Sequence, residues 1–387
     1  MIADAPPARA AADPARPVTM ADVAAAAGVS VKTVSNVLAG HAHVRPGTRD
    51  RVLAAVDALG YRVNPFASRL RSGRTGVIAF ALPHLYQPYF GDLAERVIAE
   101  GERRGLAVVI EPTDAVAAVE RAVLTGGRRQ QVDGAIVSPA ALGPAEVERL
   151  RVEGPVVLLG PRLGAPPADQ AVMDDRGAAR TAVAHLLATG RRRIAAIGAT
   201  PRGGSAGLRE AGYRDALAAA GVPVDEALVL DAPDWDRRSS GAAAAVRLLG
   251  SGAPFDAVFC FNDAMAFGAL RVLASRGLRV PDDVAVVGFD DTEQARFSTP
   301  PLTSVDPGQE QIARTAVELL VERIGGYAGE PRVVVAEHRL AVRESTGGPR
   351  TPADGLVEDS CARPVRARGR RPARLPWCPC PARPLPR

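Results

Sequence analysis

The hydrophobic pattern near the N-terminus predicts two short helices joined by a tight turn. Thr19 can cap the first helix, because acidic Asp22 stands three residues later, as in a capping box. Gly28 ends that helix, since glycine takes a left-handed conformation at no steric cost. Ser30 can cap the second helix, whose apolar positions recur at helical spacing. These positions are Val34, Val37 and Leu38.

The polar side of the second helix makes this pair a candidate DNA-binding module. Its residues Val31, Lys32, Thr33, Ser35 and Asn36 are left to face outward. In a helix-turn-helix such residues reach base edges in the major groove. A small helical hairpin with a polar face would show the same turn pattern. A third helix is predicted next, over Pro46 to Leu59.

From Gly76 onward, short apolar runs alternate with amphipathic helical segments. The first series of runs is Val77–Leu82, Ala107–Ile110, Gly134–Val137 and Val156–Leu159. The second series is Ile194–Ile197, Val229–Leu230, Ala257–Phe261 and Val284–Phe289. This alternation predicts two parallel, doubly wound sheets in tandem, and thus a two-lobed α/β core. Ligands of such sheets bind beyond the carboxyl ends of the strands, which would face one cleft.

Several side chains that follow the predicted strands, or open a helix, are candidate ligand groups. They are Tyr89, Phe90, Arg209, Trp235, Asn262, Asp263 and Asp290. Asp, Asn and Arg supply the paired donors and acceptors that sugar hydroxyls need, and aromatic faces cover the apolar face of a sugar ring. For Asp263 an equally good explanation is that it caps the helix at Ala264.

Charge and periodicity set the two ends of the chain apart from its centre. Residues 1–17 and 348–387 lack apolar periodicity, and we expect a disordered arm and a disordered Arg/Pro-rich tail. Residues 1–75 carry ten Lys/Arg against five Asp/Glu, within a net charge of +5 for the whole chain. That excess favours attraction to phosphate. The tail either makes non-specific basic contacts or has no structural role.

Other function classes find little support in the sequence. The chain has no 18-residue apolar run, no N-terminal secretory pattern and only four cysteines, so we expect a cytoplasmic protein without a membrane span. It has no nucleophile elbow or Walker loop, and its five histidines form no metal-spaced cluster. We therefore expect neither an enzyme nor a cofactor or metal site.

The N-terminal motifs, in this order, resemble the lactose-repressor (LacI/GalR) family of bacterial transcription regulators. The matching signatures are Asp22-Val23-Ala24, Ala27-Gly28-Val29-Ser30, Thr33-Val34-Ser35, Thr48-Arg49, Leu59-Gly60-Tyr61 and Asn64-Pro65-Phe66-Ala67. The resemblance runs from about Val18 to about Gly347. It implies an all-α helix-turn-helix domain followed by a periplasmic-binding-protein-like core.

The resemblance also implies roles for individual residues. A short hinge helix near Pro65–Arg71 would pair across a homodimer and enter the minor groove, with Leu70 wedged between base pairs. A simple linker contact is the alternative role for Leu70. Arg209, Asn262 and Asp290 match positions that hold the effector in this family, and Trp235 and Phe90 match positions that pack on it.

The resulting layout has five segments. They are an arm (1–17), a DNA-binding domain (18–62), a hinge (63–75), a core (76–347) and a tail (348–387). Within the core, lobe one should span about 76–176 and 305–332, and lobe two about 177–304 and 333–345. The residues expected to contact DNA are Thr19, Val31, Lys32, Thr33, Ser35, Asn36, Thr48, Asn64, Ala67, Ser68, Leu70 and Arg71.

The function expected from these features is that of a repressor controlled by a small molecule. A homodimer should bind a pseudo-palindromic operator in double-stranded DNA, because a two-fold protein needs two half-sites. A sugar or sugar derivative in the cleft is the expected effector. The alternative is a sugar-binding receptor of a transport system, which the core alone would support. The DNA-binding module and the missing secretory pattern argue against that alternative.

Overall fold

The computed structural model describes residues 18–38, 43–61, 74–127, 131–200, 203–232, 235 and 237–349. The predictions for the arm, for Asn64, Ala67, Ser68, Leu70 and Arg71 of the hinge, and for the tail beyond residue 349 lie outside these residues. The chain divides into two compact units, Met1–Gly76 and Val77–Arg387. None of the helices within the described ranges is long and apolar enough to cross a membrane.

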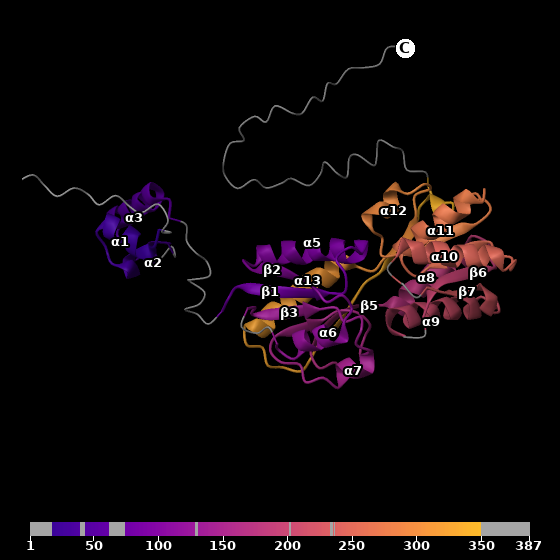
Figure 1. Ribbon diagram of the computed structural model, residues 1–387, viewed down its shortest axis with the longest axis horizontal. Helices are drawn as coiled ribbons and strands as arrows, with labels where there is room; N and C mark the ends of the chain where they lie inside the picture. The colour runs from indigo at the N-terminus through magenta and orange to yellow at the C-terminus, as the bar shows by residue number, and fades with distance from the viewer. Residues whose placement is uncertain are drawn as a thin grey trace, which may run out of the picture. The chain divides into compact units, whose positions relative to one another are not determined.

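The described residues of the first unit form three helices, drawn in indigo in Figure 1: α1 (Met20–Ala27), α2 (Val31–Leu38) and α3 (Pro46–Leu59). The predicted capping box is confirmed, because the Thr19 amide donates to Asp22 Oδ2 at 2.8 Å and the Thr19 hydroxyl accepts from the Asp22 amide at 3.4 Å. Gly28 takes the left-handed conformation at φ 63°. A small apolar core joins the three helices through Val23, Val34, Val37, Val52 and Ala55.

The second unit begins with a six-stranded sheet whose neighbouring strands are all parallel. Its strands lie in the order β11-β5-β4-β3-β1-β2. Their bounds are Val77–Leu82 (β1), Ala107–Pro112 (β2), Gly134–Val137 (β3), Val156–Leu158 (β4), Asp169–Met173 (β5) and Val333–Ala336 (β11). Together with its helices, this sheet forms the first lobe.

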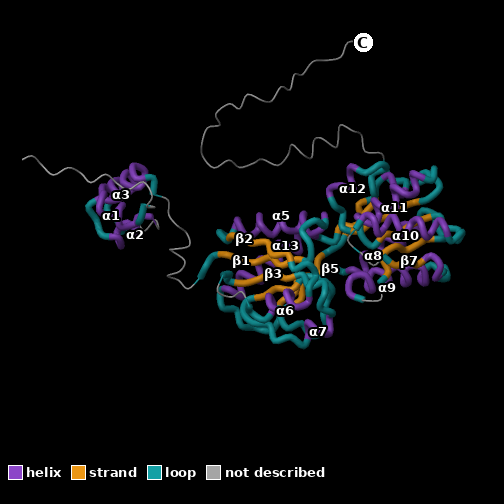
Figure 2. Tube along the Cα trace, in the orientation of Figure 1, coloured by secondary structure: helices purple, strands orange, loops and turns teal. Residues whose placement is uncertain are grey.

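Side chains alternate between the two faces of the first sheet, as the pleat of a strand requires. Phe80 belongs to the core beneath α5 (Pro88–Arg103) and α13 (Gln309–Ile324). Its neighbour Ala81 belongs to the core on the other face, where α6 (Ala117–Leu124) and α7 (Pro144–Glu148) pack. Figure 2 shows the strands in orange, with α5 on one side and α6 and α7 on the other.

The second sheet has the same doubly wound plan and forms the second lobe. Its strand order is β12-β10-β9-β8-β6-β7, and only β10 and β12 run antiparallel. The strands are Ile194–Ala199 (β6), Val229–Asp231 (β7), Ala257–Cys260 (β8), Ala285–Phe289 (β9), Thr303–Asp306 (β10) and Arg339–Ala341 (β12). The helices are Asp175–Ala188 (α8), Gly204–Ala219 (α9), Arg238–Gly250 (α10), Asp263–Ser275 (α11) and Glu293–Phe297 (α12). Helix α8 packs on α9, and α10 packs on α11.

The fold class expected from the sequence is confirmed, but two lobe boundaries are wrong. Strand β11 pairs with β5, so residues 333–336 belong to the first lobe and not to the second. Strand β10 pairs with β9, so residues 305–306 belong to the second lobe. The reason is edge pairing: β11 covers the free edge of β5, and only the chain beyond it returns to cover β10 as β12.

Asp169 is a buried carboxylate that joins three segments of the first lobe. Arg323 donates to it at 2.8 and 2.9 Å, and Arg332 donates through its amide at 2.7 Å and its guanidinium at 2.9 Å. Burial opposes ionisation, yet these hydrogen bonds lower the pKa of Asp169 to about 2. Such a carboxylate stabilises the fold at pH values above the ordinary pKa of aspartate, and this stabilisation is lost as the pH falls toward 2.

We expect Asp169→Asn to lower the free energy of unfolding by about 3 kcal/mol at neutral pH, because it removes the buried anion that pairs with both Arg323 and Arg332. Urea denaturation measures this change. The matched control is Asp215→Asn, which breaks a more exposed pair with Arg176 and should have a much smaller effect. Equal losses in the two variants would contradict the role given to Asp169.

Candidate functional site

A cavity lies where the carboxyl ends of strands from both lobes meet. Its lining comes from the end of β5, from the segments that follow β1, β3, β4, β7, β8 and β9, and from the start of α9. The lining residues are Gln87, Pro88, Tyr89, Phe90, Ser138, Gly160, Met173, Ser205, Arg209, Trp235, Asn262, Ala264, Asp290 and Thr292. Parallel strands place functional groups at this end of a sheet.

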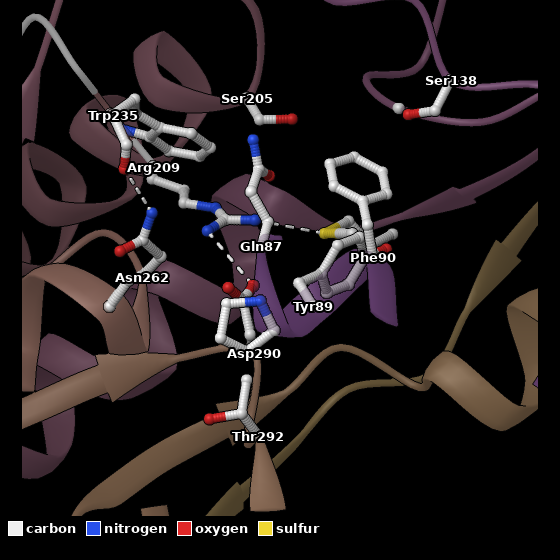
Figure 3. A pocket seen from close by; sticks show the side chains of 14 residues that line it. Gln87, Tyr89, Phe90, Ser138, Ser205, Arg209, Trp235, Asn262, Asp290 and Thr292 are labelled. Atoms are coloured by element: carbon white, nitrogen blue, oxygen red, sulfur yellow. Dashed lines mark hydrogen bonds and ion pairs between the residues drawn. The ribbon is translucent and has the colours of Figure 1, made fainter. Parts of the chain in front are cut away.

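Arg209 is the central charged group of the cavity. It is 3% exposed. Its Nε donates to Asp175 Oδ1 at 2.8 Å, and its Nη1 donates to the carbonyl oxygen of Phe261. The same Nη1 lies 3.6 Å from Asp290 Oδ1. Figure 3 shows the guanidinium between the Trp235 ring and the Asp290 carboxylate. The fold therefore fixes Arg209 on one side and leaves it facing the cavity on the other.

Asp175 holds Arg209 in place from within the second lobe. Its side chain is fully buried, and it also accepts a hydrogen bond from the Ser205 hydroxyl at 3.0 Å. Burial raises the pKa of Asp175, and Arg209 acts in the opposite direction. The sequence analysis missed Asp175 because it missed β5, the strand that ends just before it.

Asp290 faces Arg209 from a strained turn. Its φ is 106° and that of Asp291 is 47°, a region that costs non-glycine residues free energy. The backbone of Asp290 is fixed at both ends, because its amide donates to Val305 at 2.8 Å and its carbonyl accepts from Gln309 Nε2 at 3.1 Å. Strained residues of this kind cluster at ligand sites.

Aromatic rings form the less polar walls of the cavity. Tyr89 and Phe90 meet edge to face, with ring centroids 5.1 Å apart. The Trp235 indole donates to the carbonyl of Gly198 at 3.0 Å, and its ring lies 5.1 Å from the Arg209 guanidinium. Burial, and then the Asp290 carboxylate, raise the pKa of the Tyr89 phenol. The phenol therefore stays protonated.

Asn262 lines the cavity, but its amide is already engaged. Its Oδ1 caps α11 by accepting from the Met265 amide at 2.8 Å, and its Nδ2 donates to the Trp235 carbonyl at 2.6 Å. In the structure Asn262 thus holds Trp235 against the cavity. Direct contact between Asn262 and an effector stays a prediction.

The structure corrects the assignment of Asp263 to the cleft. Asp263 does not line the cavity and is fully buried. Its carboxylate accepts from the Ser304 hydroxyl at 2.6 Å and from the Thr292 amide and hydroxyl at 2.8 and 3.0 Å. The side chain joins α11 to the loop after β9 and to β10, a role that its position after a strand does not reveal.

The loop that carries Ser138 into the cavity is held by a buried carboxylate. Glu120 accepts hydrogen bonds of 2.8 to 3.1 Å from the amides of Ala140, Ala141 and Leu142. Ser138 itself follows β3 directly. The sequence analysis missed Gln87, Ser138, Ser205 and Thr292. Ser138 could have been predicted, because it directly follows a predicted strand, where ligand groups of a parallel sheet are expected.

In the first unit, the residues predicted to contact bases lie on the outer side of α2. Val31 is 43% exposed and Lys32 is also exposed. Thr33, Ser35 and Asn36 are half-buried. The Thr33 amide donates to Ser30 Oγ at 3.1 Å, which confirms the predicted cap. Thr19 and Thr48 are half-buried, and the Thr19 hydroxyl also donates to Asp22 at 2.6 Å.

Comparison with known proteins decides the family. Residues 19–64 match the model of bacterial regulatory proteins of the lacI family, and residues 183–346 match the periplasmic binding protein-like domain. The chain is 39% identical over 338 residues to the HTH-type transcriptional regulator CelR of Thermobifida fusca, covering 84% of this chain and 98% of CelR. The chain belongs to the LacI family of bacterial transcriptional regulators.

Solved structures of LacI-family members share the fold. A complex of the transcriptional regulator CelR with cellobiose is 37% identical, covers 85% of this chain and 100% of its own, and gives a TM-score of 0.62. The lac repressor dimer bound to operator and the anti-inducer ONPF is 28% identical, covers 86% and 99%, and gives a TM-score of 0.72. The resemblance stated from the sequence motifs is therefore confirmed.

The described part of this LacI-family chain contains no group of three or more His, Cys, Asp or Glu side chains that could hold a metal ion. The cavity instead offers one guanidinium, one facing carboxylate, hydroxyls, two side-chain amides and aromatic faces. This set can bind a neutral, hydroxyl-rich molecule.

Asp263 gives a pH-dependent prediction for the fold around the cavity. Burial raises the pKa of Asp263 to about 7. The folded protein thus holds this proton more tightly than the unfolded chain does. The resulting stabilisation is complete at pH values below the ordinary pKa of aspartate, and it is lost as the pH rises toward 7.

We expect the free energy of unfolding of the wild type, relative to Asp263→Asn, to fall between about pH 4 and about pH 7. Urea denaturation at a series of pH values measures both proteins. The difference between them isolates Asp263 from other titrating groups. A difference that is constant over this range would show that the carboxyl titrates at its ordinary pKa.

Proposed function

We propose that this LacI-family regulator is a repressor that binds a pseudo-palindromic operator as a homodimer and is controlled by a sugar or sugar derivative in the cavity between its lobes. One observation carries the proposal: a cavity with Arg209 facing Asp290 and aromatic walls stands in the same chain as helix α2, on which Val31 and Lys32 are exposed. Since operator DNA lies in the bacterial cytoplasm, we place the protein there.

A sugar suits the polar pair at the centre of the cavity. A hydroxyl can accept from the Arg209 guanidinium while it donates to Asp290, because a hydroxyl is both donor and acceptor. The rings of Phe90 and Trp235 can cover the apolar face of the sugar ring. The complex of CelR with cellobiose supports a carbohydrate as the class of effector.

Binding in this cavity provides a means of control. Phe90 and Ser138 come from the first lobe, and Arg209 and Asp290 come from the second. A ligand held by both lobes favours the arrangement of the lobes in which all its contacts form. That shift has to reach the DNA-binding unit through the residues between Tyr61 and Val77, for which we retain the proposed hinge with its minor-groove wedge at Leu70.

A transport receptor for sugars is the weaker candidate. It would use the same cavity and the same two lobes. Such a receptor would have no use for helices α1 to α3. The side-chain caps of α1 and α2 and the exposed residues of α2 are typical of a helix-turn-helix. A binding assay with duplex DNA distinguishes the two functions, because a regulator binds the duplex and a transport receptor does not.

We expect Asp290→Asn to weaken effector binding by about 10- to 150-fold, because it removes a charged hydrogen-bond acceptor. Affinity for operator without effector should be unchanged. Titration calorimetry with sugars and fluorescence anisotropy with labelled DNA measure the two properties. The matched control is Asp291→Asn, whose carboxylate pairs with Arg343 at 2.6 Å and does not line the cavity. Wild-type effector affinity in Asp290→Asn would reject the assignment.

Asn36 tests the proposed base readout, since Asn pairs well with adenine. Asn36→Ala should cost about 1–3 kcal/mol at one position of each half-site and relax the base preference there. Selection of bound duplexes from a random pool, followed by affinity measurements, reveals the change. If affinity fell equally for all sequences, Asn36 would contact the DNA backbone instead.

A further inference from the structure

The chain contains a single lysine, Lys32. It is the one lysine among 48 lysine and arginine residues, and arginine occupies every other basic position. The two side chains differ chemically, because a lysine amine takes up acyl groups whereas the arginine guanidinium stays protonated and charged in proteins. Chemistry that targets side-chain amines can therefore act on this chain at one residue.

The amine of Lys32 is accessible on helix α2. Lys32 is the second residue of that helix and is exposed. Its side chain forms no hydrogen bond or ion pair with any other residue that the structure describes. The nearby hydroxyls of Ser30 and Thr33 bond to each other at 2.9 Å. An acyl donor can therefore reach the Lys32 amine without displacing a contact within the described protein.

The positive charge of Lys32 does not stabilise α2. The first turn of a helix carries partial positive charge on its free backbone amides, so a cation there is unfavourable. The first turn of α2 holds no acidic residue that would offset the charge of Lys32. The apolar packing of this helix comes from Val34 and Val37 on the opposite, buried side. Neutralising Lys32 should therefore leave the fold of the first unit intact.

The charge of Lys32 is useful in contact with DNA. A lysine ammonium group attracts phosphate and can donate to guanine in the major groove. An acyl group on this nitrogen removes the charge and leaves one N–H donor in place of three. A homodimer on a two-fold operator brings one Lys32 to each half-site, so modification of both subunits alters two contacts at once.

We propose that Lys32 is an acylation site, and that its modification by an acyl thioester releases the regulator from its operator. The neutral amine attacks the carbonyl carbon of the thioester. A C–N bond forms, the C–S bond breaks, and the thiol leaves with the proton that the amine loses. The inference rests on the proposed function, because it adds a covalent means of control to the proposed operator-binding surface. This control acts in the first unit, whereas the effector cavity lies in the second.

Fluorescence anisotropy of the full-length protein with its selected operator tests the effect of the modification. The proteins compared are the wild type, a protein with Nε-acetyllysine in place of Lys32, and the variants Lys32→Gln and Lys32→Arg. We expect Nε-acetyllysine and Lys32→Gln each to weaken binding about 10-fold or more, as the loss of one contact in each half-site would give. Lys32→Arg keeps the charge and the donors, so it should bind about as tightly as the wild type.

Arg51→Gln is the matched control for the loss of one positive charge. Arg51 is an exposed residue of α3 in the same unit. Its replacement should weaken operator binding much less than Lys32→Gln does. Thermal unfolding followed by circular dichroism should show that the acetylated protein and all three variants are as stable as the wild type.

Mass spectrometry tests whether the amine is accessible. The full-length protein is incubated with acetyl-coenzyme A in three states, which are folded, folded on operator DNA, and denatured in urea. We expect Lys32 to be acetylated at similar rates in the folded and the denatured protein. Operator DNA should slow the reaction, because the groove covers the residues on the outer side of α2.

Four results would overturn the inference. They are unchanged operator affinity with Nε-acetyllysine at position 32, a loss in Arg51→Gln as large as that in Lys32→Gln, acetylation of Lys32 that is much slower in the folded than in the denatured protein, and acetylation that operator DNA does not slow. Failure of the unmodified protein to bind any duplex would overturn the proposed function instead. The selection of an operator reveals that outcome before any variant is compared.

Discussion

The buried charge of Arg209 is the constraint on which the site depends. A guanidinium taken out of water has to be compensated by well-placed anions and acceptors. Asp175 and the Phe261 carbonyl supply this compensation within the second lobe, and Asp290 stands on the cavity side. The strained turn at Asp290 is held by Val305 and by Gln309, at the start of the helix that returns to the first lobe. One network of ion pairs and hydrogen bonds therefore links the cavity to the segment between β10 and α13, where the chain passes from the second lobe to the first.

This arrangement explains how a small ligand can have a large effect. The cavity is built from loops of both sheets, so binding free energy is gained only when the lobes are placed to contact the ligand together. Allosteric coupling of about 1–3 kcal/mol corresponds to a change in affinity of about 5- to 150-fold at the other site. In our proposal the other site is the outward face of α2.

Local sequence signals predicted the elements that depend on local chemistry. The capping box at Thr19, the Ser30 cap and the apolar strands β1 and β9 follow from neighbouring residues. Strand β5 escaped prediction because it begins with the polar residues Asp169 and Gln170, which are nevertheless buried. The burial of Asp169 depends on Arg323, which lies far along the chain, and Gln170 accepts a hydrogen bond from the Leu163 amide. Asp263 and Asp290 both follow predicted strands, yet only Asp290 lines the cavity. The two aspartates differ because of their tertiary hydrogen bonds, which the spacing of residues in the sequence does not reveal.

The most direct test of the central claim is the affinity of the full-length protein for its selected operator, measured by fluorescence anisotropy with and without a saturating sugar that binds the cavity. The account predicts a change of about 5- to 150-fold, because the ligand and the operator favour different arrangements of the two lobes. An operator affinity that stays the same while calorimetry shows the sugar bound would contradict it.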